Sequence, residues 1–125
     1  MRRLLLSLAV AVVLYGCSKP QADHPTPEAD RAPSYVEVAN HFALPVEIFV
    51  SGGGSVRRLG TVHPGMRAHY TLPPTFGNGN TVEFRADAGP GQVMYRSAEM
   101  LVQPGAIVDF DVASVLFNSS AVIRP

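Results

Sequence analysis

The sequence is poor in cysteine, tryptophan and charged residues. Its 125 residues include one cysteine and no tryptophan, and only 16% are charged. Ten Lys and Arg balance ten Asp and Glu, so the formal net charge is zero. This balance excludes a basic nucleic-acid-binding protein and a highly charged disordered chain. Eleven glycines and eleven prolines instead indicate one small domain with many turns.

Long apolar runs are also missing. A transmembrane helix requires about 20 consecutive apolar residues, whereas the run over residues 4–15 is twelve residues long and contains Ser7. Arg2 and Arg3 precede this run, and the small residue Gly16 follows it. A basic start, a short apolar run and a small residue are the layout of a secretory signal peptide. We therefore expect residues 1–16 to be a signal peptide.

The single cysteine follows directly, and it has no partner for a disulfide within the chain. The residues Leu14, Tyr15, Gly16 and Cys17 resemble the lipobox of bacterial lipoproteins. The resemblance covers residues 1–17 only. It implies cleavage between Gly16 and Cys17, a diacylglycerol thioether on Cys17 and an acyl chain such as palmitate on the new amine. It further implies a place in the bacterial cell envelope, and Ser18 after the cysteine favours the outer membrane, facing the periplasm.

The next segment has the composition of a spacer. Residues 18–34 contain four prolines and no large apolar residue, so they lack the surface to form a packed core. We expect residues 17–34 to form the lipidated cysteine and a flexible, Pro-rich tether, and residues 35–125 to form the domain. Loss of Arg2 and Arg3 leaves eight basic against ten acidic side chains, which argues against a nucleic-acid partner.

Alternation with a period of two residues predicts that the domain is all-β. β-Branched and aromatic residues alternate with polar ones in five runs, which predict strands with one buried face. Clusters of Gly and Pro separate the runs. We expect seven to nine strands in a small antiparallel β-sandwich, of immunoglobulin-like or transthyretin-like topology, with a small barrel as the alternative. The five runs are residues 36–38, 46–50, 66–72, 82–86 and 108–112.

Two further segments carry weaker patterns. Residues 56–62 have no clean apolar face, and a β-bulge near Gly60 would reconcile them. Residues 118–120 are expected to turn a last hairpin between strands at 114–117 and 121–124. Met66 is expected at the edge of the core.

The sequence offers little for catalysis. It has no Gly-x-Ser-x-Gly motif, and Gly52–Gly54 lacks the Lys-Ser/Thr of a phosphate-binding loop. We therefore expect no enzyme, no catalytic residue, no cofactor and no metal. The alternative is a small periplasmic metal-binding protein or hydrolase, in which three imidazoles converge with two carboxylates. Its residues would be His41, His63, His69, Asp109 and Asp111.

Apolar residues outside the alternating pattern suggest a binding surface. Tyr35, Phe49 and Leu101 alternate away from the expected core, while Phe42 and Phe76 lie in expected loops. If some lie together, they form a patch that binds a partner. The sequence thus indicates a non-enzymatic cell-envelope lipoprotein, held on the membrane through Cys17. Its head would be a β-sandwich that binds an envelope protein or polymer, or serves as an accessory module.

Overall fold

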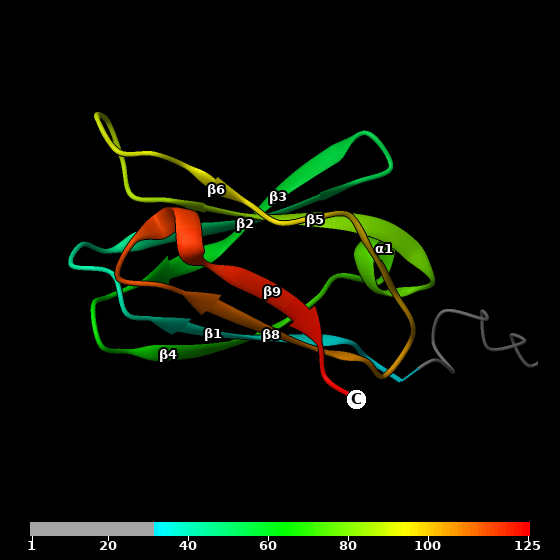
Figure 1. Ribbon diagram of the computed structural model, residues 1–125. Coiled ribbons are helices and arrows are strands. Elements are labelled where there is room, and N and C mark those ends of the chain that lie inside the picture. Colours follow the sequence, from blue (N-terminus) through cyan, green and yellow to red (C-terminus); the bar gives the residue numbers. More distant parts are fainter. Residues whose placement is uncertain (1–31) are drawn as a thin grey trace, which may run out of the picture.

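The structure is a computed structural model that describes residues 32–125 (Figure 1). The expected signal peptide, the lipidation site Cys17 and the expected tether up to residue 31 lie outside the described residues.

The described chain is built almost entirely of strands. Nine strands, one four-residue helix and one 3-10 turn follow one another in residues 32–125. In order they are β1 (Tyr35–Asn40), β2 (Val46–Gly52), β3 (Ser55–Val62), β4 (Arg67–Thr71), α1 (Pro74–Gly77), β5 (Asn80–Asp87), β6 (Tyr95–Arg96), β7 (Met100–Val102), β8 (Ile107–Val112), η1 (Leu116–Asn118) and β9 (Ser120–Ile123).

The strands form two sheets that face each other (Figure 1). The first sheet has the order β4-β1-β8-β9, and the second has the order β3-β2-β5-β6, with β7 also pairing with β5. This confirms the expected small all-β sandwich. One pair differs from the expected antiparallel pattern, because β1 and β8 are parallel. Parallel neighbours require a long crossover, and here all the chain from β2 to β7 provides it.

The strand order also separates the two expected topologies. In an immunoglobulin-like sandwich the first and second strands pair within one sheet. Here β1 pairs with β4 and β8, while β2 belongs to the other sheet. The immunoglobulin-like topology therefore does not apply, and the order is compatible with the transthyretin-like one.

The core lies between the sheets and follows the predicted alternation. Phe110 of the first sheet contacts Phe84 and Tyr95 of the second, with ring centroids 6.1 and 5.8 Å apart. Burial of such side chains contributes about 1.5–3 kcal/mol each. The alternating residues that are fully buried are Val36, Val38, Val46, Ile48, Val50, Val82, Phe84, Ala86, Val108, Phe110 and Val112.

The expected irregularity near Gly60 is a β-bulge. Ile48 pairs with Gly60 and Phe49 with Arg58, so Leu59 has no partner on β2 and its side chain packs against the core. A Cβ atom at position 60 would lie 2.5 Å from the Tyr70 hydroxyl oxygen, so any larger residue there would require the Tyr70 ring to move. The extra residue explains why neither face of β3 reads as apolar.

Three local expectations are wrong. Residues 114–117 are a loop and the first two residues of η1 rather than a strand, because the hairpin forms between β8 and β9. Phe76 belongs to α1 and is buried in the core instead of lying in an exposed loop. Met66 is 58% exposed, because it precedes β4 and turns away from the core.

Candidate binding surface at the loop end

Four loops gather at one end of the sandwich, at the left of Figure 1. They are residues 41–45, 63–66, 88–94 and 113–119, and we call them the tip. The first described residue, Ala32, lies at the other end, where the Gly105 amide donates to its carbonyl oxygen at 3.0 Å. At the same end the Ser34 hydroxyl lies within hydrogen-bonding distance of the Gln103 and Gly77 carbonyl oxygens, at 2.8 and 3.1 Å. The chain therefore enters the domain opposite the tip.

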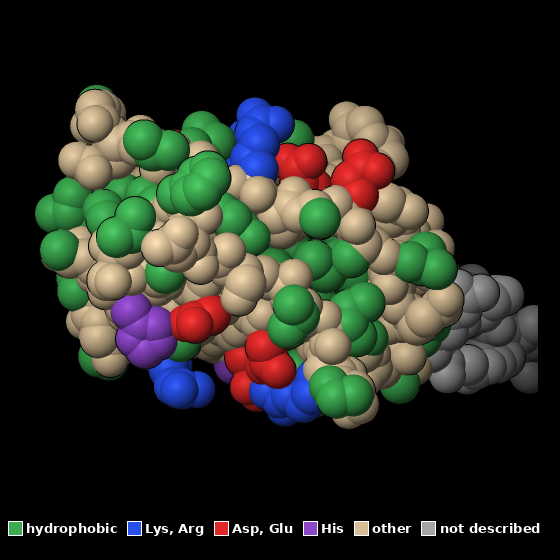
Figure 2. Space-filling model, viewed as in Figure 1, with side chains coloured by type: hydrophobic (Ala, Val, Ile, Leu, Met, Phe, Trp, Pro, Cys, Tyr) green, Lys and Arg blue, Asp and Glu red, His purple; other side chains and the backbone are tan. Residues whose placement is uncertain are grey.

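The tip carries most of the exposed apolar side chains. Six of the ten large apolar residues that are exposed within residues 32–125 belong to it, so exposed apolar surface is concentrated at one end. Phe117 is the most exposed, at 84%. Figure 2 shows apolar side chains gathered at this end of the visible face. The six residues are Leu44, Met66, Val93, Met94, Val115 and Phe117.

The tip also carries no formal charge. None of its residues is Asp, Glu, Lys or Arg. The charged side chains nearest in sequence, among them Arg67, Asp87 and Asp111, stand at the ends of the strands. His41 and His63 are its only titratable side chains, and His41 Nε2 lies 3.0 Å from Asp111 Oδ1. The tip is thus a neutral, apolar surface bordered by charge.

A buried asparagine holds two of the loops together. The Asn40 side-chain amide donates to the Leu44 and Val62 carbonyl oxygens at 3.0 and 2.9 Å, and its Oδ1 accepts from the Phe42 amide at 2.8 Å. Its backbone amide donates to the Met66 carbonyl oxygen at 3.0 Å. Since Asn40 is 1% exposed, these bonds are shielded from water. Sequence reasoning missed this residue, although it is a polar residue at an inward position after Val36 and Val38.

A buried leucine holds the loop between β8 and β9. Leu116 packs into the core, and the 3-10 turn around it turns its neighbours Val115 and Phe117 outward. The Ser119 hydroxyl accepts from the Ala113 amide at 2.9 Å and closes the loop. A hollow of about 420 Å³ lies between this loop and two others. Its lining is Phe42, Gln92, Val93, Ser114, Val115, Leu116 and Phe117.

The loop between β5 and β6 depends on glycine. Gly89 and Gly91 have φ angles of 98° and 80°, a left-handed conformation that other residues rarely adopt. The Gly89 amide donates to Asp87 Oδ1 at 2.9 Å. This turn presents Val93 and Met94 to solvent.

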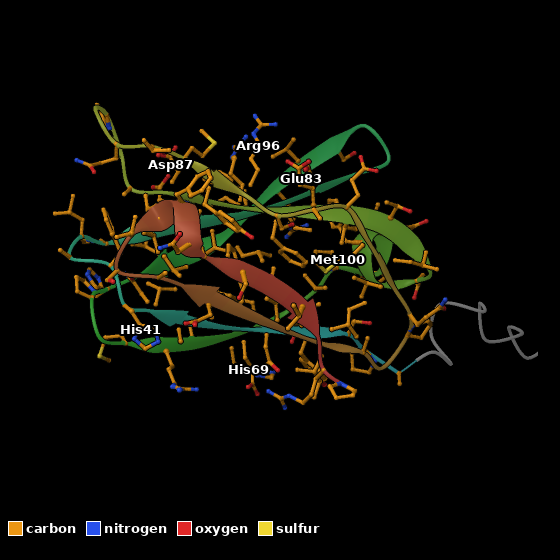
Figure 3. All side chains as sticks on the ribbon, viewed as in Figure 1. His41, His69, Glu83, Asp87, Arg96 and Met100 are labelled. Atoms are coloured by element: carbon orange, nitrogen blue, oxygen red, sulfur yellow. The ribbon has the colours of Figure 1, made fainter. Side chains whose placement is uncertain are left out.

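Four of the five residues expected in a metal or hydrolytic site line one hollow on the outer face of the first sheet. His41, His69, Asp109 and Asp111 border this hollow of about 510 Å³ together with Glu37, Arg67 and Arg124. His63 is not part of its lining and lies in the tip instead. Figure 3 shows His41 and His69 on this face, while Glu83, Asp87 and Arg96 lie on the face of the other sheet.

Arg124 already pairs with two of the three carboxylates of this hollow, Asp109 and Glu37. Arg124 Nη2 lies 2.5 Å from Asp109 Oδ1 and 2.6 Å from Glu37 Oε2, and its Nε donates to Asp109 Oδ2 at 3.0 Å. These hydrogen bonds hold the pKa of both carboxyl groups below its usual value and raise the pKa of Arg124. His69 Nδ1 lies 3.5 Å from Glu37 Oε1. Among residues 32–125, no three His, Cys, Asp or Glu side chains are grouped to hold a metal ion.

The three expected partner-binding residues lie apart. Tyr35 is on the outer face of the first sheet, with its ring centroid 4.7 Å from that of His69. Phe49 is on the outer face of the second sheet, where the Arg85 guanidinium lies 4.5 Å from its ring centroid. Leu101 is half-exposed on β7, opposite Thr81. The three do not form one surface, and a partner for any of them stays a prediction.

Two arginines of the second sheet pair with acidic neighbours. Arg58 Nε lies 3.5 Å from Glu47 Oε1, and Arg96 Nη1 lies 3.5 Å from Glu83 Oε1. Exposed pairs of this kind contribute about 0.2–1 kcal/mol each. They leave this face without a concentration of positive charge.

Comparisons with known proteins do not assign the chain to a family. No protein-family model matches the chain, and a search of curated proteins found no match. The described residues contain no helix with the length and apolar character needed to span a membrane.

Proposed function

We propose that this protein is a non-enzymatic lipoprotein of the bacterial cell envelope. In this proposal Cys17 carries the lipid anchor, and the β-sandwich is a binding or accessory module whose binding surface is the tip. The observation that carries the proposal is the concentration of exposed, uncharged apolar side chains opposite the point where the chain enters the domain. Exposed apolar patches of this kind mark interaction sites.

The position of the anchor in the chain leaves the tip accessible. The lipobox-like residues 14–17 precede the domain, and Ala32 enters it at the end remote from the tip. Acyl chains on Cys17 would hold the protein on the outer membrane, facing the periplasm, and leave the tip free to bind. No cofactor is part of this proposal.

Metabolic labelling tests the anchor. Cells that express the protein are grown with radiolabelled palmitate, and we expect label in the wild type and in Ser18→Ala but none in Cys17→Ser. Ser18→Ala is the matched control, because it changes the adjacent residue and keeps the thiol. Label that persists in Cys17→Ser would refute lipidation at this residue.

Photocrosslinking tests the tip as the binding surface. A photoreactive amino acid replaces Phe117 in the tip or Val56 in β3, which is also exposed and lies outside the tip. We expect crosslinked products in cells from position 117 and few from position 56. Equal yields from both positions would contradict a binding role for the tip.

The hollow on the first sheet supports a second candidate function. His41, His69, Asp109 and Asp111 do line one surface, as a metal-binding protein or hydrolase would require. Arg124 nevertheless occupies the Asp109 carboxylate, so zinc would first have to displace a charged partner. Titration of the purified protein with zinc decides between the two candidates. Stoichiometric binding that His69→Ala abolishes would favour this candidate, and no binding would favour the first.

A further inference from the structure

We propose that the tip inserts its apolar side chains into the boundary between headgroups and hydrocarbon of the lipid bilayer that carries the anchor. This inference rests on the proposed function, because it names what the tip binds and assumes lipid on Cys17. It commits to lipid rather than to a protein or a second copy of the chain.

The shape of the tip fits a bilayer. Its apolar side chains come from four separate loops, and the exposed fraction ranges from 39% at Met94 to 84% at Phe117. A rigid protein partner has to match side chains from four separate loops with one complementary surface. Fluid lipid chains adapt to them without a preformed counterpart.

The distribution of charge supports lipid as well. Charged side chains are costly within the hydrocarbon, and the tip contains no Asp, Glu, Lys or Arg. The charged groups that border it stand on the strands, where Asp111 lies 3.0 Å from His41 and Asp87 accepts from the Gly89 amide. Insertion of the exposed apolar side chains therefore does not require a charged side chain of the strands to enter the hydrocarbon.

The chain between Cys17 and the domain is long enough for the tip to reach the membrane that holds the anchor. The chain from Cys17 to Ala32 spans at most about 50 Å when fully extended. The longest strand, β5, has eight residues and is about 26 Å long. The connection is thus about twice as long as the longest strand, and this length lets the domain turn its tip toward the anchoring membrane. Anchoring also raises the effective concentration of the tip at the surface, so a weak insertion suffices.

The same features predict which lipids matter. Surface binding through Lys and Arg requires anionic lipid and weakens in salt. Because the tip has neither residue, its insertion should be the same in neutral and anionic bilayers and at low and high salt. This independence separates insertion by the tip from adsorption through arginines on the sheet faces.

Depth-dependent fluorescence quenching tests the proposal in the full, lipidated chain. Met66→Cys in the tip and Val56→Cys in β3 form a matched pair, with exposed fractions of 58% and 60% in the native residues. Each variant carries an environment-sensitive fluorophore and is reconstituted in phosphatidylcholine vesicles that contain a quencher on the acyl chains. We expect a blue-shifted, strongly quenched probe at position 66 and a water-exposed, weakly quenched probe at position 56.

A second variant ties the quenching to the tip. Val115→Ser together with Phe117→Ser, in the Met66→Cys chain, removes two exposed apolar side chains and should lower the inserted fraction about tenfold or more. Circular dichroism and thermal unfolding confirm that each variant is folded. Phosphatidylglycerol in the vesicles and high salt should leave the quenching unchanged.

Several outcomes would overturn the inference. Equal, weak quenching at positions 66 and 56 in vesicle-bound protein would place the tip in water, and energy transfer between tips would show a second copy instead. Quenching that requires anionic lipid would assign binding to the sheet faces. None of these outcomes affects the palmitate test of the anchor. Crosslinks from position 117 to a protein would overturn insertion into lipid but would still support the proposed function, with a protein as the partner of the tip.

Discussion

At the scale of single residues, Asn40 holds the tip in place and Arg124 links charged side chains on the outer face of the first sheet. The buried Asn40 makes three hydrogen bonds with its side chain, to one tip loop and the end of β3, and its backbone bonds a second tip loop at Gly65 and Met66. Arg124 joins Asp109 and Glu37, which come from neighbouring strands, on the outer face of the first sheet. The first is shielded from water and the second is exposed, so their loss should have different consequences.

Asn40→Ala should destabilise the domain and loosen the tip. The substitution leaves the Leu44 and Val62 carbonyl oxygens and the Phe42 amide without their partner, which costs about 2–3 kcal/mol of unfolding free energy. Urea unfolding followed by circular dichroism measures the loss. Asn118→Ala is the control, because that exposed side chain makes no such bonds, and it should change stability by about 0.5 kcal/mol or less. Equal effects of the two substitutions would contradict the role of Asn40.

Arg124→Gln should change how stability depends on pH. In the wild type, Arg124 keeps the pKa of Asp109 and Glu37 below the values of the unfolded chain. The resulting stabilisation is present above about pH 4 and is lost as the pH falls through the lowered folded values. The variant should therefore be less stable than the wild type at neutral pH, and the difference should vanish in strong acid. Carboxyl NMR titration should show both pKa values rising toward normal, whereas unchanged values would exclude this pairing.

At the scale of elements, alternation predicts strands well and fails where side chains from loops enter the core. The buried faces of β1, β2, β5 and β8 follow the predicted pattern. Phe76 and Leu116 lie in short helical turns outside any alternation, and nothing local distinguishes them from exposed loop residues such as Phe117. Their burial depends on the gap that the two sheets leave at each end.

The three apolar residues at 115–117 should therefore differ in importance. Leu116→Ala creates a cavity in the core and should cost about 2–4 kcal/mol. Phe117→Ser changes a side chain that is already in solvent and should cost about 0.5 kcal/mol or less. Thermal unfolding of both variants measures the difference, and a larger loss in Phe117→Ser would mean that the loop is packed in another way.

At the scale of the whole molecule, the tip and the point of entry of the chain lie at opposite ends of the sandwich (Figure 1). The parallel pairing of β1 with β8 contributes to this arrangement, because both strands end at the tip and both begin near Ala32. Under the proposed function, the length of the connection to Cys17 then decides what the tip can reach.

Shortening that connection should prevent insertion of the tip. After deletion of residues 20–30, only Ser18, Lys19 and Arg31 separate Cys17 from Ala32. The distance from Cys17 to Ala32 can then be at most about 14 Å, which is less than the length of β5. We expect palmitate labelling to persist and quenching of the probe at position 66 to fall to the level at position 56. Replacement of the same residues by a Gly/Ser sequence of equal length is the control and should restore quenching. Full quenching after the deletion would mean that reach is not what limits insertion.

Local pattern in the sequence determined β1, β2, β4, β5 and β8, the bulge at Gly60 and most of the core, because neighbouring residues alone specify a period of two. Only the tertiary structure decided that β1 and β8 are parallel and that Leu44, Met66, Val93 and Phe117 meet at one end. It also separated Tyr35 from Phe49, which look alike in the alternation. Pairing between distant strands depends on how both sheets bury their apolar faces together, and that requirement is not local in the chain.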